Sequence, residues 1–254
     1  MFNRIISFLF LTLTLSTNVL AFGTDGCFNK SVFLMHMDGS DTSTSFTDED
    51  CAGTGKKIIT ASGNAQLDNS IVKFGTAAGL FDGVGDFITT PDSADFTVGN
   101  GDWTVDCWFN RAGGDLTFRV LCGQSDVAAT DASRTIEMRL TSANVLEGVT
   151  IGATVTGTTA ISTTGWHHAA FVRTGDILRL FLDGVQEGGD VARTTPINDS
   201  SADYGVGQLG QFGLVWNGSI DEFRFTNGVA LWTKNFTPPS TPYCSGCEMV
   251  GAFD

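Results

Sequence analysis

The clearest pattern in the chain is a pair of apolar runs, residues 166–172 and 177–182, around a short polar loop. In the second run three leucines occupy alternate positions, which is the period-2 pattern of a half-buried β-strand. The loop contains Gly175, and strand-forming runs that flank a short glycine-containing loop are typical of a β-hairpin. The pattern therefore predicts a hairpin that acts as a central scaffold of the fold.

Similar short runs recur along the whole chain, and no convincing amphipathic helix interrupts them. Further strands are expected at residues 31–38, 56–61, 77–81, 86–90, 103–110, 116–122, 134–140, 145–151, 153–161, 206–209, 214–216 and 219–225. Residues 188–204 are expected to form a long loop, and residues 228–233 one short helical turn. About 12 to 14 short strands separated by glycine-rich turns predict an all-β sandwich or barrel.

The first 21 residues have the pattern of a secretory signal. Asn3 and Arg4 precede an apolar stretch at residues 5–15, and the segment ends in the small residue Ala21. The stretch is shorter than the ~20 residues that span a bilayer, although an N-terminal anchor or a misassigned start remains the alternative. We expect residues 1–21 to be removed, and residues 22–254 to form a single domain with short N- and C-terminal extensions. The mature protein is then extracellular, at a cell or virion surface, with no membrane span.

The charge of the chain is strongly acidic. It has 28 acidic residues against 14 lysines and arginines, and a formal net charge of −14. Because the basic residues form no cluster, nucleic acids and anionic membranes are disfavoured as partners. The excess acidity favours solubility, and a cation would be bound only at a few local carboxylate sites.

Six cysteines follow the signal: Cys27, Cys51, Cys107, Cys122, Cys244 and Cys247. An even number in an exported chain predicts disulfides. If the strands that carry Cys107 and Cys122 form a hairpin, the two residues lie opposite each other, near disulfide reach. The other expected pairs are Cys27–Cys51 and a local Cys244–Cys247 bridge. A redox or zinc half-site is the alternative for the last pair, although no second CxxC or nearby histidine completes a zinc set.

Three blocks together resemble the laminin-G-like branch of the concanavalin A-like jelly rolls, a type common in phage and environmental bacterial proteins. The blocks are FDGVGDFITTPDSADFTVGNGDWTVDCWFN (81–110), GWHHAAFVRTGDILRLFLDG (165–184) and GSIDEFRFTNGVALWTKNFTPP (218–239). The resemblance covers about residues 31–242. It implies a two-sheet antiparallel jelly-roll sandwich with a concave face, often a structural calcium, and a role in binding glycans or proteins. The cysteines are not part of the usual pattern of the family.

The resemblance also implies where calcium would bind. It places the FDG strand beside the IDEF strand, so that Asp82, Asp86, Asp221 and Glu222 converge, and hard cations prefer such carboxylate oxygens. The alternative is that Asp82 is a turn residue and Asp221 a strand-end residue, each bonded to a local amide.

An aromatic platform for a sugar is expected at Trp108. In a strand, Asp106, Trp108 and Asn110 share one face, and this mixture of stacking and hydrogen-bonding groups suits a pyranose. Packing in the core or at its rim is the alternative for Trp108.

A glycosidase constellation is missing from the sequence. Retaining glycosidases need two carboxylates about 5–5.5 Å apart, which on one strand requires a Glu-x-Asp-x-x-Glu run. No such run occurs, and Asp221 and Glu222, being consecutive, are expected on opposite faces of their strand. We therefore expect a secreted, non-enzymatic module that binds carbohydrate or an extracellular protein. The alternatives are a structural subunit of an extracellular or virion-surface assembly, such as a homo-oligomer, and, third, a glycoside hydrolase.

Overall fold

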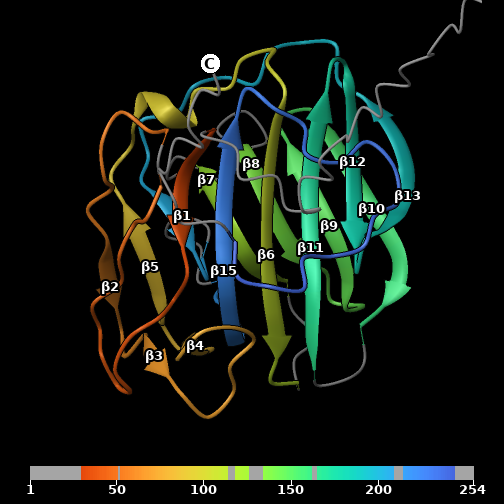
Figure 1. The fold of residues 1–254 in the computed structure, drawn as a ribbon. Coiled ribbons are helices and arrows are strands. Elements are labelled where there is room, and N and C mark those ends of the chain that lie inside the picture. The colour runs from red at the N-terminus through yellow and green to blue at the C-terminus, as the bar shows by residue number, and fades with distance from the viewer. Residues whose placement is uncertain are drawn as a thin grey trace, which may run out of the picture.

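The computed structural model of the chain describes residues 30–50, 52–113, 118–125, 134–161, 165–208 and 214–243. These residues form fifteen β-strands and one short 3₁₀ helix, η1 (Ala94–Phe96). The strands build two antiparallel sheets that pack face to face (Figure 1). The all-β sandwich predicted from the sequence is confirmed. Within the described ranges, no helix has the length and apolar character needed to cross a membrane.

Sheet A contains both the first and the last strand of the described chain. In spatial order it consists of β13 (Val185–Ala192), β12 (Ile177–Leu182), β11 (Trp166–Thr174), β6 (Trp103–Arg111), β15 (Asn217–Asn227), β4 (Ala78–Asp82) and β3 (Gln66–Asp68), with β1 (Ser31–Met35) paired to β15. The predicted hairpin is confirmed as β11 and β12, with Thr174 opposite Ile177 at the turn. It lies beside the long central strands β6 and β15.

Sheet B forms the second layer. In spatial order it consists of β10 (Ala153–Ala160), β9 (Val145–Thr150), β8 (Arg134–Leu140), β7 (Arg119–Ser125), β14 (Tyr204–Val206), β5 (Phe87–Thr90) and β2 (Thr60–Ser62). Strand β8 begins and ends at the residues expected from its alternating pattern. Its apolar residues Ile136, Met138 and Leu140 all face the core, as that alternation predicts.

Aromatic side chains fill the core between the sheets. Phe96 of η1 stacks on Tyr204 of β14 at 4.8 Å and on Phe225 of β15 at 5.6 Å between ring centroids. Phe96 and Val98 are both buried in this core. These contacts fix η1, and with it the loop that follows β5, against the body of the sandwich.

Three local expectations are wrong. Strand β13 occupies residues 185–192, within which the sequence predicted the start of a loop, because it pairs with β12 despite its glycines and charges. Residues 214–216 are not a strand, and residues 228–233 form no helical turn. Both of these segments are instead held by tertiary contacts, as the bond from the backbone N–H of Trp216 to the carbonyl of Gly207 illustrates.

The prediction that the strands carrying Cys107 and Cys122 form a hairpin is also wrong. Strand β6, which carries Cys107, lies in sheet A, and strand β7, which carries Cys122, lies in sheet B. The two strands pair with other partners, so the register argument for a bridge between Cys107 and Cys122 does not apply. Both side chains are buried free thiols in the core. Cys27, Cys51, Cys244 and Cys247 lie outside the described residues.

The segment after β15 crosses the outer face of sheet A (Figure 1). The rings of Trp232 and Phe236 stack on each other at 4.0 Å, and Trp232 packs on β11 and β12. The backbone N–H of Phe236 donates to the carbonyl of Gly184, which has a φ of 78° in the turn before β13. A Cβ at position 184 would lie 2.0 Å from the carbonyl oxygen of Phe236, so only glycine fits this turn.

Candidate functional site

The three residues of the predicted sugar platform lie on β6, but they are not exposed. Trp108 is only 6% exposed, because residues 73–74 and Tyr243 cover it. The Lys73 ammonium lies 3.7 Å from the centroid of the Trp108 ring. Asn110 accepts a hydrogen bond from the backbone N–H of Gly165. The prediction of an exposed platform is therefore wrong, since the C-terminal segment and a distant loop close over this face.

Asp106, beside Trp108, belongs to a buried ionic cluster. Its carboxylate accepts two hydrogen bonds from Arg224, at 3.0 and 2.9 Å, and lies 3.4 Å from Nε2 of His168. The hydroxyl of Tyr243 lies 3.0 Å from the same His168 nitrogen, and its ring stacks 4.0 Å from the Arg224 guanidinium. Burial acts to raise the pKa of Asp106, but Arg224 and His168 outweigh it and lower that pKa. The cluster is closed to ligands and acts as a structural anchor for the C-terminal segment.

A β-bulge places the two consecutive acids of β15 on the same face. The pairing of β15 with β6 shifts register between Asp221 and Arg224, and Glu222 has a φ of 52°. Asp221 accepts from the backbone N–H groups of residues 73 and 74, while Glu222 accepts from the N–H of Tyr243. Both sets of partners pack on the outer face of sheet A. The expectation of opposite faces is wrong, because a bulge inserts one residue and resets the alternation.

The four predicted calcium ligands do not fit a calcium ion. Asp82 lies opposite Asn217 at one end of the β4–β15 pairing, whereas Asp221 lies beyond its other end. Asp86 accepts from the N–H of Asp82, which identifies it as a brace for the turn that follows β4. Glu222 is bonded to His36 at 2.8 Å. In the part of the chain that the structure describes, no three His, Cys, Asp or Glu side chains are arranged to hold a metal.

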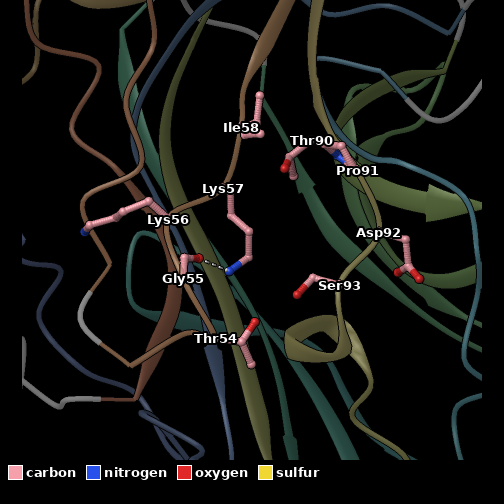
Figure 2. Close-up of a pocket in the computed structure, with 9 residues that line it drawn as sticks. All are labelled: Thr54, Gly55, Lys56, Lys57, Ile58, Thr90, Pro91, Asp92 and Ser93. Atoms are coloured by element: carbon pink, nitrogen blue, oxygen red, sulfur yellow. Dashed lines mark hydrogen bonds between the residues drawn. The ribbon is translucent and has the colours of Figure 1, made fainter.

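An open groove of about 270 Å³ lies at the edge of sheet B (Figure 2). One wall is the segment that leads into β2, and the other is the segment that leaves β5. Because β2 and β5 are paired, the two segments run near each other where the strands meet. The lining residues are Thr54, Gly55, Lys56, Lys57, Ile58, Thr90, Pro91, Asp92 and Ser93.

Lys57 forms the polar centre of the groove. Its ammonium donates to Asp95 at 2.6 Å and to the carbonyl of Gly55 at 3.0 Å, and the latter bond is visible in Figure 2. The Asp95 carboxylate also accepts from the backbone and hydroxyl of Thr54. Burial acts to raise the pKa of Asp95, but the bonds from Lys57 and Thr54 outweigh it and lower that pKa. These bonds hold the two walls at a fixed separation.

Thr90 carries a hydroxyl without a partner. Its side chain is 1% exposed, lines the groove, and has no hydrogen bond to its Oγ1. In Figure 2 the side chains of Thr90 and Ser93 point from their wall toward the opposite one. Because the Thr90 Oγ1 is buried without accessible surface, it cannot meet a ligand in the groove. The partly exposed hydroxyl of Ser93 is the polar group that this wall offers.

Apolar surface flanks these polar groups. Ile58 is 76% exposed at the rim of one wall, and Pro91 is exposed on the other. An apolar surface with a few placed hydrogen-bonding groups is the usual composition of a small-molecule site. The sequence pattern does not predict this groove, because it indicates a strand over residues 56–61, although the adjacent lysines Lys56 and Lys57 in an acidic chain are a signal for it.

Comparison with known proteins gives the same fold. The chain is similar to the binding domain of paraclostridial mosquitocidal protein 1, with a TM-score of 0.60 and 11% identity, covering 80% of this chain and 50% of that one. It is similar to the botulinum neurotoxin DC binding domain solved with rat synaptotagmin II, with a TM-score of 0.57 and 12% identity, covering 80% and 49%. The chain therefore spans about half the length of these toxin domains. At these identities the likeness shows the fold alone.

A third solved structure matches over most of its own length. It is domain 4 of AbnA, a GH43 extracellular arabinanase from Geobacillus stearothermophilus, in complex with arabinotriose, with a TM-score of 0.57 and 19% identity, covering 79% of this chain and 94% of that one. A search among curated proteins found no match. A family model described as the concanavalin A-like lectin/glucanases superfamily matches residues 82–233. This match covers more than half of the chain, which therefore belongs to the concanavalin A-like lectin/glucanase superfamily.

Proposed function

We propose that this chain is a secreted, non-catalytic module that binds carbohydrate at an extracellular surface, through the groove at the edge of sheet B. One observation carries the proposal: the groove combines exposed apolar rims, Ile58 and Pro91, with the accessible hydroxyls of Thr54 and Ser93 on its two walls. Sugars present apolar C–H faces and many hydroxyls, so both kinds of surface have a counterpart on the ligand.

The similar proteins support a binding role. The AbnA domain is described in complex with arabinotriose, and the two toxin chains are described as binding domains. A binding role also suits the carboxylates beside the groove. Asp95 is held by Lys57, and Asp92 accepts from the side-chain amide of Gln124 at 2.8 Å. Neither is placed as the unengaged acid of a hydrolytic pair.

The proposal is tested by titrating the purified protein with arabinotriose by calorimetry and by screening it on a glycan array. Ile58→Ala removes an apolar rim of the groove and is expected to weaken binding about four- to fifteenfold, since about one to two buried CH₂ equivalents of about 0.8 kcal/mol each are lost. Val84→Ala is the matched control, because Val84 is 78% exposed on a turn outside the groove. Binding that Val84→Ala and Ile58→Ala reduce equally, or no binding to any glycan, would contradict the proposal.

Export is tested separately. If residues 1–21 are a signal, expression in a host with a secretory pathway gives an extracellular protein whose mass corresponds to residues 22–254. Retention of the full-length chain in the membrane fraction would instead favour an N-terminal anchor.

A further inference from the structure

A lysine and an aspartate, both with little exposed surface, meet in a geometry that brings together the atoms of an amide bond. Nζ of Lys57 lies 2.6 Å from Oδ2 of Asp95, and the two side chains are only 5% and 8% exposed. We propose that these residues condense into an intramolecular isopeptide bond, which links the segment before β2 covalently to η1. The proposal does not depend on sugar binding, since it concerns only the side chains of this chain.

Contact and burial both favour the condensation. Groups that a structure holds together react as if each were present at about 10⁵–10⁸ M, provided that the reacting atoms are close and aligned. The carboxyl carbon of Asp95 is one covalent bond beyond the oxygen that the Lys57 ammonium contacts. The ring centroid of Phe96 lies 5.8 Å from the same ammonium, and Phe96 is 3% exposed. These surroundings keep away the bulk water that would drive the reverse reaction.

A second carboxyl group, that of Asp50, is placed to carry protons. Its side chain is 3% exposed, and burial, together with the neighbouring Asp48, raises its pKa to about 6. Near neutral pH it can therefore both accept and donate a proton. The backbone of Gly53 lies among the reacting groups. A Cβ at this position would lie 2.5, 2.9 and 3.0 Å from Oδ2 of Asp50, Nζ of Lys57 and Oδ2 of Asp95, so the three groups surround one point.

The reaction balances without an oxidant or a co-reactant. The Lys57 nitrogen attacks the carboxyl carbon of Asp95, and one C–O bond of that carboxyl group breaks. The ammonium gives up two protons, one directly to the Asp95 carboxyl group and one through Asp50, and both leave with the departing oxygen as one water. The backbone N–H and the hydroxyl of Thr54 donate to Oδ2 of Asp95 at 2.8 and 3.0 Å, so Oδ2 is the oxygen that stays in the amide. These donors stabilise the negative charge that develops on it.

The test is the intact mass of the purified mature chain, measured after incubation of the folded protein at neutral pH and then reduction and denaturation. An isopeptide bond lowers the mass by one water relative to the sequence from the observed N-terminus, and it survives denaturant, whereas an ion pair does neither. A tryptic digest is expected to contain a branched peptide that joins residues 57 and 95, because trypsin does not cleave after an acylated lysine. The same mapping separates this bond from succinimide formation at Asp-Gly sequences, which also releases water.

Three variants assign the roles. Lys57→Arg keeps the positive charge but has no amine to condense, so it is expected to have its full sequence mass. Lys56→Arg is the matched control, because Lys56 is 58% exposed, and it is expected to lose one water as the wild type does. Asp50→Asn keeps the size of the side chain but cannot carry a proton, and is expected to slow the loss of water in refolded protein by about 100-fold or more.

A full sequence mass in folded wild-type protein would overturn the proposal, and this readout needs no variant to fold. A water loss that persists in Lys57→Arg, or that maps to other residues, would overturn it as well. Cross-linking of Asp50→Asn at the wild-type rate would overturn the role of Asp50 as proton carrier. None of these outcomes involves a glycan, so they are distinct from those that test the proposed function.

Discussion

At Glu222 the backbone of β15 leaves the extended conformation. This one residue determines which side chains of β15 face outward at the centre of sheet A. A positive φ is uncommon for a residue with a Cβ and costs about 1–3 kcal/mol, so it persists only where the surroundings compensate for it. Here the carboxylate bonds to His36 and to the backbone N–H of Tyr243 supply that compensation. The result is that Asp221 and Glu222 are buried side by side beneath the C-terminal segment.

The first prediction concerns the pH dependence of stability at Asp221. Burial raises its pKa to about 8, with Glu222 adding to the rise and the N–H groups of residues 73 and 74 opposing it. The unfolded value is about 3.9, so the stabilising contribution of Asp221 is fully present below that pH and is lost as the pH rises through 8. We expect the Tm of the wild-type protein to fall between about pH 5 and pH 8 on this account, and Asp221→Asn to flatten the slope.

Differential scanning calorimetry at several pH values checks this prediction. Asp82→Asn, which changes an exposed carboxylate on β4, serves as the control. A slope that is the same in Asp221→Asn and in the wild type would show that another group causes the dependence.

The second prediction compares two ion pairs of similar length but different burial. Asp106–Arg224 is 2.9 Å long and fully buried, whereas Asp190–Arg179 is 2.7 Å long with a half-exposed carboxylate. Asp106→Ala leaves Arg224 buried without that carboxylate and is expected to cost about 3–5 kcal/mol of unfolding free energy. Asp190→Ala is expected to cost less than about 1 kcal/mol. Urea denaturation measures both, and equal losses would contradict the assigned difference in burial.

At the scale of elements, the two sheets are joined by hydrogen bonds at the β13–β10 edge of the sandwich. Glu187 of β13, in sheet A, accepts from the backbone N–H groups of Thr158 and Thr159 of β10, in sheet B, at 2.6 and 3.0 Å. It also accepts from the hydroxyl of Thr159 at 2.7 Å. One buried carboxylate thus satisfies N–H groups on an edge strand that would otherwise be open to another chain.

The third prediction is that Glu187→Ala loosens this edge. Loss of hydrogen bonds to a charged group costs about 1.5–3 kcal/mol, and amide exchange in β10 is expected to quicken more than in β8. Gln186→Ala, on the same strand, is the control, since the side-chain amide of Gln186 bonds Asp190 of its own strand. Hydrogen exchange detected by mass spectrometry gives the strand-by-strand rates, and uniform quickening in both strands would argue against a local joint.

At the scale of the whole molecule, the core contains reactive groups that the fold protects. Cys107 and Cys122 come from different sheets and are both fully buried. Burial raises the pKa of Cys122 to about 12, although bonds from Tyr204 and the backbone of Met138 lower it, and burial also raises that of Cys107. Because the thiolate is the reactive form, both thiols should be inert in the folded protein.

The fourth prediction follows from this protection. Labelling with N-ethylmaleimide at neutral pH, followed by peptide mapping, is expected to leave Cys107 and Cys122 unmodified until the denaturant concentration reaches the unfolding midpoint. Cysteine reactivity at these two positions then reports global unfolding. A mapped peptide pair linked through Cys107 and Cys122 in the non-reduced protein would contradict the free thiols.

The sequence by itself determined the fold class, since alternation and turn residues are local signals and local signals specify strands. Strand β8 and the β11–β12 hairpin followed directly from their leucine, isoleucine and methionine positions. The three blocks that resemble concanavalin A-like jelly rolls added the arrangement of the sheets, and the family match confirmed it.

Only the tertiary structure decided which residues are available to a ligand. Strand alternation placed Asp106 and Trp108 on one face correctly, but burial of that face depends on residues 73–74 and 228–243, which are distant in sequence. The bulge at Glu222 and the separation of Cys107 from Cys122 likewise depend on strand pairing, which couples residues far apart in the chain. The groove at the edge of sheet B carries no sequence motif, and its two walls, residues 54–58 and 90–93, lie near each other only because β2 pairs with β5.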